Sequence, residues 1–176
     1  MRENLGWFRF VVLAQAAFVL AWAGWHEHLR TSSPTILLRV SPVDPRDLLR
    51  GDYMILNYDI SQVPLSEDIK EKLPDGEVGV AAGRTVFVVL EKKGNYWEYV
   101  RAAGSAPEVS ADQIVIQGNA AYQSRVGKVR INYGIERFYV PEGKGSPSFK
   151  ELAVRAAVSG HKLYLKELLV DGHPYP

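Results

Sequence analysis

The chain has 176 residues, of which 47% are hydrophobic and 11% aromatic, and its formal net charge is +1. This charge balance excludes the broad basic field of a nucleic-acid-binding protein, so we expect no nucleic-acid partner. There are zero cysteines, which excludes disulfides, thiolate catalysis and cysteine metal sites. The length suits one domain preceded by a membrane anchor.

An apolar segment near the N-terminus is the first predicted element. Residues 10–25 carry no charge and one strongly polar side chain, Gln15. Extending the segment back to residue 5 gives the roughly 20 residues that a bilayer span needs. Trp7 at one end, and Trp22 and Trp25 at the other, would form aromatic belts at the two interfaces. We therefore predict a transmembrane anchor and short flank over residues 1–30, in contact with lipid through residues 5–25.

The flanking charges predict the orientation of this anchor in the cytoplasmic membrane. Arg2 and Arg9 precede the segment and Arg30 follows it, so the positive-inside bias favours a cytoplasmic N-terminus. Residues 31–176 would then form a domain in the periplasm or outside the cell. A signal peptide cleaved after Ala23 is the alternative, because Ala21-Trp22-Ala23 fits the small-x-small cleavage pattern. Both interpretations export the domain, and the tryptophans favour the uncleaved anchor.

The exported part is predicted to be mainly β. Short segments rich in alternating apolar, β-branched or aromatic residues are separated by turn signals, which indicates an antiparallel sandwich or small barrel. A slip in the apolar alternation near the C-terminus suggests a bulge. The predicted strands are 35–40, 53–60, 85–91, 96–100, 114–118, one or two within 128–140, and a closing hairpin of 153–158 and 162–170.

One or two short helices are expected among these strands. Ser66 is a candidate N-cap followed by acidic residues, and Leu65, Ile69 and Leu73 recur at helical spacing, which predicts a helix over residues 63–73. A helical turn is expected over residues 148–152. Lys92 to Asn95 is predicted as the turn of the clearest hairpin.

The central stretch runs from a charged turn into the second strand. Arg50-Gly51-Asp52 is turn chemistry, because glycine adopts positive φ freely and aspartate bonds to nearby backbone amides. Arginines and aspartates alternate around it, which predicts an ion-paired corner whose individual pairs are weak. The residues of this corner are Arg39, Arg46 and Arg50 with Asp44, Asp47 and Asp52.

The same stretch resembles a known family. It resembles, letter for letter, the signature of the GDYxxLxY family, through Gly51-Asp52-Tyr53-x-x-Leu56-x-Tyr58. The apolar N-terminal segment, residues 43–47 and a second segment over residues 133–143 also resemble that family. The resemblance implies a small, membrane-anchored bacterial protein associated with multi-span membrane proteins, and it implies no established activity.

A serine–lysine hydrolase is the catalytic alternative. Ser41 to Pro45, followed by Gly51-Asp52, loosely resembles the nucleophile motif of type I signal peptidases, but Pro42 and Arg46 depart from it. No segment resembles the motif that carries the lysine base, which must be desolvated to act near neutral pH. Lys92 and Lys93 flank a hairpin turn and should be solvated. A lysine within hydrogen-bond reach of the Ser41 hydroxyl would identify this alternative.

Metal and cofactor chemistry find little support. The aspartates of the corner lack the spacing of a calcium-binding loop, and their arginine neighbours would hold them ionised. His161 and His173 fall in predicted turns without a second ligand pattern, so we interpret both as surface residues. We expect no cofactor, no metal and no catalytic residue.

The favoured hypothesis is a non-catalytic domain that binds or stabilises an integral membrane protein. Aromatic and charged residues border the second segment, and we expect this segment to lie beside the central turn as a recognition rim. A small-ligand carrier is a third hypothesis, which would require an enclosed apolar cavity. The candidate binding residues are Arg46, Arg50, Gly51, Asp52, Tyr53, Tyr58, Glu136 and Arg137.

Overall fold

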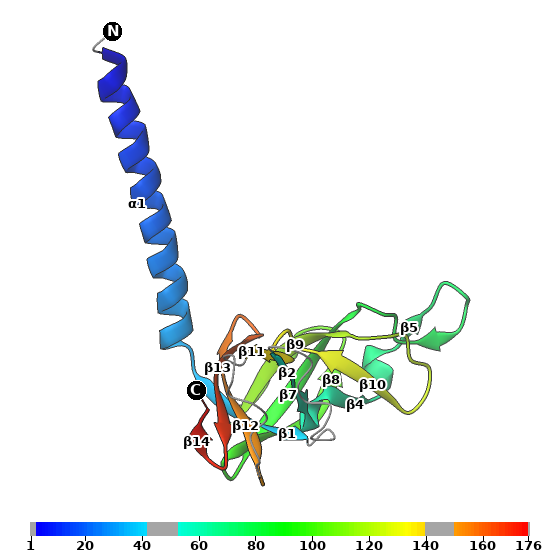
Figure 1. Ribbon diagram of the computed structural model, residues 1–176. Helices are drawn as coiled ribbons and strands as arrows, with labels where there is room; N and C mark the ends of the chain where they lie inside the picture. The colour runs from blue at the N-terminus through cyan, green and yellow to red at the C-terminus, as the bar shows by residue number, and fades with distance from the viewer. Residues whose placement is uncertain (1–2, 42–52, 140–149, 176) are drawn as a thin grey trace. The chain divides into compact units, whose positions relative to one another are not determined.

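The computed structural model describes residues 3–41, 53–139 and 150–175. The chain divides into two compact units, Met1–Ser33 and Pro34–Pro176. The first unit is a helix and the second is built of strands (Figure 1).

Helix α1, Glu3–Ser32, forms the first unit. Its central 19 residues, Trp7–Trp25, are apolar except for Arg9 and Gln15, and none of them is buried within the protein. At 1.5 Å per residue this stretch rises about 28 Å, close to the thickness of the hydrocarbon core of a bilayer. The helix is therefore long and apolar enough to span a membrane.

The second unit contains two five-stranded antiparallel sheets and two smaller strand pairs, so the prediction of a mainly β antiparallel fold is confirmed. The first sheet has the order β14 (His173–Pro174), β13 (Lys162–Val170), β12 (Leu152–Ser159), β1 (Thr35–Ser41), β3 (Asn57–Tyr58). The second has the order β4 (Gln62–Pro64), β10 (Lys128–Asn132), β9 (Gln113–Ala120), β7 (Thr85–Lys93), β8 (Tyr96–Ala103). The smaller pairs are β11 (Arg137–Tyr139) with β2 (Tyr53–Ile55), and β5 (Glu71–Lys72) with β6 (Val78–Gly79).

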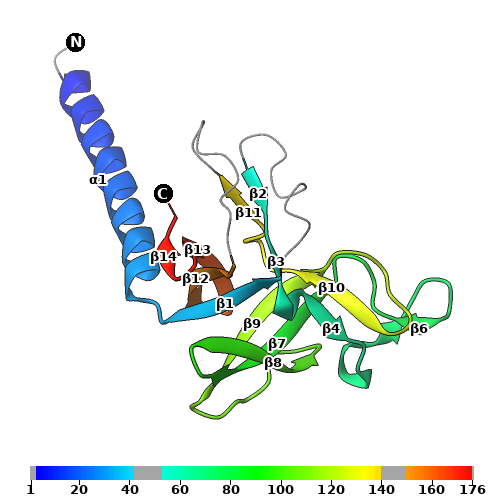
Figure 2. The same cartoon turned by 60° about the horizontal axis from the view of Figure 1, so that its bottom comes forward.

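Both large sheets contribute to one hydrophobic core. In β1 the alternation expected of a half-buried strand is clear, because Ile36, Leu38 and Val40 are buried while Thr35 and Arg39 are exposed. Buried side chains of β7, β9, β10, β12 and β13 join the same cluster, namely Val86, Val88, Leu90, Ile116, Val129, Ile131, Val154, Ala156, Leu163 and Leu168. Figure 2 shows the strands of the two sheets from which these side chains come.

Two-residue turns close three hairpins. The predicted closing hairpin is confirmed: Gly160 and His161 join β12 to β13, and their φ angles of 54° and 67° are those a type I′ turn demands. The predicted bulge is also confirmed, because the register shifts between Arg155 and Ala156. The Asp171-Gly172 turn before β14 has φ angles of 49° and 82° and was not predicted.

The helix predicted over residues 63–73 is wrong. Residues Gln62–Pro64 form β4 against β10, and the 3₁₀ turn η2, Glu67–Ile69, and strand β5 follow. The Leu65 amide donates to the Gly127 carbonyl at 2.9 Å, and the Ser66 side chain forms no cap hydrogen bond. Strand pairing has satisfied the backbone that a helix would have used, so tertiary context overrides the local spacing.

Three smaller expectations are also corrected. Lys92 and Lys93 extend β7, so that the turn contains only Gly94 and Asn95. The strand predicted over residues 53–60 is split into β2, β3 and the 3₁₀ turn η1, Asp59–Ser61. In the described part of residues 148–152 there is no helical turn, because the amides of Lys150 and Glu151 donate to the Asp171 carboxylate at 2.9 and 2.8 Å.

Candidate binding surface on the signature strands

The signature residues pass from β2 into β3. Tyr53 begins β2, Leu56 lies between the two strands, and Tyr58 ends β3. Four predicted site residues lie outside the described residues, together with the aspartates of the predicted ion-paired corner. These four are Arg46, Arg50, Gly51 and Asp52.

Strand β2, which follows the predicted central turn, pairs with β11 of the second segment, while the turn itself lies outside the described residues. The strands are antiparallel, with Tyr53 opposite Tyr139 and Ile55 opposite Arg137. We call this two-stranded element the ribbon. Figure 2 shows it projecting away from the sheet that contains β7, β8 and β9.

Two buried tyrosines fasten the base of the ribbon. The Tyr58 hydroxyl donates to the Ile135 carbonyl at 2.6 Å, and the Tyr133 hydroxyl donates to the Ile60 carbonyl at 2.7 Å. These side chains are 2% and 6% exposed. Each segment therefore reaches across to the backbone of the other, and we call this reciprocal arrangement the tyrosine clasp.

The environment of the clasp keeps both phenols protonated. Burial raises the pKa of Tyr58 and of Tyr133 far above the ordinary value, and the nearby Glu136 carboxylate raises each pKa further. A protonated phenol is a hydrogen-bond donor, which is what the two carbonyl acceptors require. The clasp therefore stays intact at neutral pH.

Glu136 shapes the chain between the clasp and the ribbon. Its carboxylate accepts hydrogen bonds from the amides of Tyr133 and Gly134, the latter at 2.9 Å, and Gly134 has a φ of +86°. The Glu136 carbonyl also accepts the Leu56 amide at 2.8 Å. Glu136 is thus a positioning residue that sets the angle at which β11 leaves the core.

Gly118 makes room for the clasp. A Cβ atom at this position would come within 2.9 Å of Tyr133 Cδ1 and 2.7 Å of the Asn132 carbonyl oxygen. Such separations are shorter than side chains tolerate, so only glycine lets the Tyr133 ring lie flat against β9.

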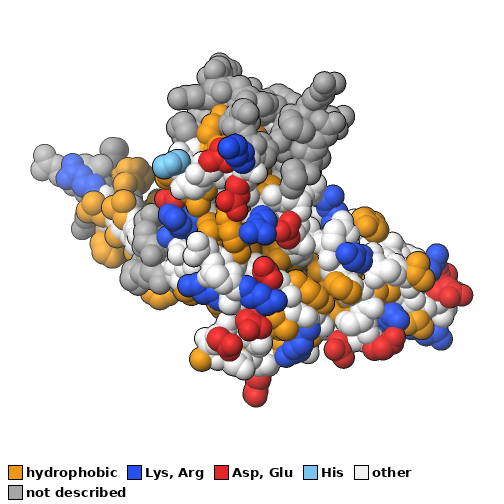
Figure 3. All heavy atoms as spheres, turned by 90° about the horizontal axis from the view of Figure 1, so that it is seen from below, with side chains coloured by type: hydrophobic (Ala, Val, Ile, Leu, Met, Phe, Trp, Pro, Cys, Tyr) orange, Lys and Arg blue, Asp and Glu red, His pale blue; other side chains and the backbone are white. Residues whose placement is uncertain are grey.

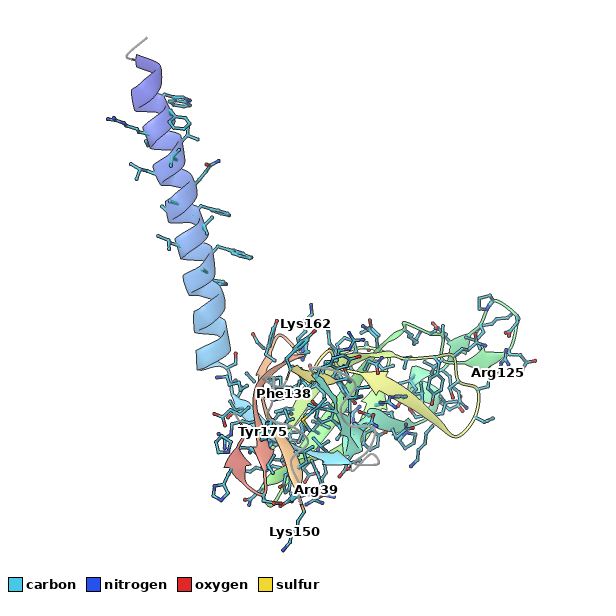
Figure 4. All side chains as sticks on the ribbon, in the orientation of Figure 1. Arg39, Arg125, Phe138, Lys150, Lys162 and Tyr175 are labelled. Atoms are coloured by element: carbon cyan, nitrogen blue, oxygen red, sulfur yellow. The ribbon has the colours of Figure 1, made fainter. Side chains whose placement is uncertain are left out.

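One face of the ribbon is exposed and rich in tyrosine and arginine. The Arg137 guanidinium lies 5.5 Å from the centre of the Tyr53 ring. The centres of the Tyr53 and Tyr139 rings are 6.1 Å apart. Tyr139 is 71% exposed. On the opposite face Met54 is fully buried, and the Phe138 ring packs 6.5 Å from Tyr175; both Phe138 and Tyr175 are labelled in Figure 4. We call Tyr53, Arg137 and Tyr139 the ribbon face.

The structure gives the hydrolase alternative no support in the described residues. The Ser41 hydroxyl donates to the Asp59 carboxylate, and no hydrogen bond joins it to a described lysine. Lys92 and Lys93 are exposed, and Lys93 pairs with Glu98 at 3.4 Å. The partner of the serine hydroxyl in the described residues is therefore a carboxylate and not the lysine that this alternative requires.

Metal ligation is equally unsupported in the part of the chain described. No group of three or more histidine or acidic side chains there could hold a metal ion. His161 is exposed, with its ring edge-on to Phe87 at 5.9 Å, and His173 is also exposed. On the face seen in Figure 3, basic and acidic side chains are interspersed with apolar ones, so no field of a single sign covers it.

Sequence reasoning missed two features of this surface. Tyr139 was not among the predicted site residues, although its spacing of two from Arg137 in a strand places both on one face. Tyr133 was not singled out, because the pairing of its hydroxyl with Ile60 joins residues 73 positions apart. Arg39, predicted to belong to the ion-paired corner, has its guanidinium 4.5 Å from the Tyr96 ring centre (Figure 4).

Fold and surface together define a class of protein in which a helix able to span a membrane precedes an antiparallel β-unit with a projecting ribbon. The chain belongs to the GDYXXLXY protein family, whose profile matches residues 15–166. No curated protein and no solved structure matches the chain. The resemblance seen in the signature is therefore confirmed at the level of the family.

Proposed function

We propose that this protein is a single-pass membrane protein whose β-unit lies outside the cytoplasmic membrane and binds an integral membrane protein without catalysing a reaction. The observation that carries the proposal is the ribbon face, an exposed Tyr–Arg–Tyr cluster on a ribbon fastened by the tyrosine clasp. The proposal also takes residues 1–30 as the anchor and residues 31–176 as the binding domain.

The composition of the ribbon face supports recognition. Tyrosine and arginine are the residues most enriched in the energetically dominant centres of protein interfaces, and Tyr139 is 71% exposed. The contacts of Tyr53 with Arg137 and with Tyr139 restrict all three side chains before any partner arrives, which lowers the entropic cost of binding. Of the other predicted residues, Tyr58 is buried and would act by holding the ribbon in place.

Helix α1 supports the choice of a membrane partner. A helix that holds the β-unit at the membrane raises the effective concentration of the ribbon face toward any protein in the same bilayer. The resemblance to the family implies association with multi-span membrane proteins. The arginines before the apolar segment favour an external β-unit.

Site-specific photocrosslinking tests the contact. A photoreactive phenylalanine analogue at Tyr139 should give a discrete adduct in native membranes, and mass spectrometry should identify an integral membrane protein in it. The matched control is the same analogue at Tyr122, a second exposed tyrosine outside the ribbon. No adduct from position 139, or the same adducts from both positions, would contradict the proposal.

The orientation has its own test, aided by the absence of native cysteine. A Tyr122→Cys variant should react with a membrane-impermeant maleimide in intact cells. Reaction only after the cells are broken would place the β-unit in the cytoplasm and reject the proposed localisation. Chain length on a denaturing gel, compared with that of the unprocessed protein, distinguishes the anchor from a signal peptide cleaved after Ala23.

A further inference from the structure

Two clefts meet beside the base of the ribbon. The first has a volume of about 260 Å³ and lies between β9, the end of β10 and the start of β13. The second has a volume of about 370 Å³ and lies between β10 and the start of β11. Asn132 and Gly134 line both, so the two clefts are neighbours, and we call them together the polar groove.

The groove carries more positive than negative charge. Arg130, Arg137 and Lys162 line it, and none of them forms an ion pair with another described residue. Its one acidic lining residue is Glu136, whose carboxylate already accepts two backbone amides. The lining of the groove therefore contains three cations and one carboxylate, and each oxygen of that carboxylate already accepts a backbone amide.

The groove also holds side chains with free hydrogen-bonding capacity. The side chains of Gln117, Asn132 and Tyr164 line it, and these side chains form no hydrogen bond with any residue that the structure describes. A carboxamide both donates and accepts, and a phenol does the same, so these groups suit a ligand with several hydroxyls. Asn119 is partly engaged, since its amide oxygen accepts the Thr85 hydroxyl at 3.2 Å.

Its walls are fixed in place by contacts elsewhere. The Arg130 guanidinium donates to the Asn57 side chain, so one edge remains bound to the signature segment. The Gln117 amide donates to the His161 carbonyl at 2.8 Å, which holds β9 beside the turn that precedes Lys162. Figure 4 shows Lys162 at this turn. The cations are consequently presented by a preorganised frame.

We propose that the polar groove binds a polyhydroxylated ligand that carries a phosphate group, of the glycerophosphate type, either free or as the headgroup of a phospholipid. Arginine binds phosphate oxygens through two parallel hydrogen bonds, and a lysine adds a compact third charge. The amides and the phenol would bind the hydroxyls. This site is separate from the ribbon face except at Arg137, and it does not depend on the membrane-protein partner.

Titration of the full chain in a neutral detergent with glycerol 3-phosphate tests the site by calorimetry. Lys162→Gln and Arg130→Gln should each raise the Kd about tenfold or more, because each removes a charge-assisted contact. The control Lys92→Gln removes an exposed lysine of β7 and should leave the Kd unchanged. Rising salt should weaken the binding. Arg130 also bonds Asn57, so Arg130→Gln could unfold the protein. The Lys162 side chain is exposed, so Lys162→Gln should fold and still tests the site.

A second arm distinguishes the source of the phosphate. Native mass spectrometry of the protein released from nanodiscs should show phosphatidylglycerol, but not phosphatidylcholine, retained by the wild type and lost from Lys162→Gln. Binding of either probe that is weakened by Lys162→Gln supports the proposal. If only the phospholipid binds, the groove is a site for a lipid headgroup. Failure of both, or equal loss in Lys92→Gln, overturns it. With the photoreactive analogue placed at Tyr53, Tyr139→Ala should abolish the crosslinked complex and leave this binding intact, so the two proposals fail separately.

Discussion

The tyrosine clasp and the ribbon face are built from the same two segments of the chain, yet they are opposites in burial. In the clasp, Tyr58 and Tyr133 are 2% and 6% exposed, and each hydroxyl has a backbone acceptor. On the ribbon face, Tyr139 is 71% exposed, and its ring lies tilted with its centre 6.1 Å from that of Tyr53. The same residue type thus holds the structure together at one end and is left available at the other.

The difference follows from what surrounds each hydroxyl. A buried phenol needs a partner, because an unsatisfied polar group in the core costs about 1–3 kcal/mol. An exposed phenol has water as its partner and gives the fold little. The clasp should therefore govern stability and the ribbon face should govern binding, and substitutions can separate the two.

The largest effect is expected from the signature leucine between the two regions. Leu56 is fully buried, and Leu56→Ala should lower the free energy of unfolding by about 2–5 kcal/mol, from lost burial and the cavity left behind. Urea unfolding of the full chain in detergent measures this loss. The control Val126→Ala, at a position 83% exposed, should change it little. A loss below about 1 kcal/mol would mean that the site collapses around the cavity.

The clasp itself is expected to contribute next. Tyr58→Phe and Tyr133→Phe each leave a buried carbonyl without its donor and should cost about 1–3 kcal/mol. Because the two bonds join the same pair of segments, the double variant should show a coupling energy of about 0.5–3 kcal/mol. Additive effects would show that the bonds act independently. Tyr139→Phe is the control and should be nearly neutral.

Local patterns predicted the β-unit well where a strand has one buried face. Alternation predicted β1, and β-branched and aromatic content predicted the hairpin of β7 and β8, because burial acts there on each residue separately. The same reasoning failed at residues 63–73. The apolar spacing there is real, since Ile69 and Leu73 are buried, but strand pairing with β10 decided the backbone.

The site was predicted less completely than the fold, for a related reason. The signature led to the stretch that contains β2, and β2 pairs with β11 of the second segment, whereas the predicted central turn lies outside the described residues. The sequence could not separate Tyr58 from Tyr53, although one is buried and the other is half-exposed, because both fit an alternating strand. That distinction depends on an acceptor 77 residues away from Tyr58, which no local pattern encodes.

Ionisation of the tyrosines sharpens the comparison. The pKa of each clasp phenol is raised mainly by burial, while an unfolded tyrosine ionises near pH 10.0. The stability that these phenols contribute is therefore complete below pH 10 and is lost as pH rises above it, because the unfolded chain then releases protons that the folded chain retains. Unfolding free energies measured on both sides of pH 10 should show this fall, reduced in the Tyr58→Phe, Tyr133→Phe double variant.

Spectrophotometric titration of the folded protein locates the effect. Phenolate absorbance between about pH 9 and 11 should be unchanged by Tyr58→Phe and by Tyr133→Phe, because burial raises the pKa of both phenols in the folded chain. An equal drop in both variants would show that the clasp opens before the protein unfolds.

The smallest effect on stability is expected on the ribbon face, which we propose as the binding surface. Arg137→Ala and Tyr139→Ala remove exposed side chains, so each should change the free energy of unfolding by about 0.5 kcal/mol or less. Both should nevertheless abolish the photocrosslinked complex, detected with the photoreactive analogue at Tyr53, whereas Tyr122→Ala should preserve it. If instead both variants unfold at clearly lower urea, the ribbon face is part of the scaffold. The division between a structural base and a binding tip would then have to be abandoned, because the same residues would be serving the fold.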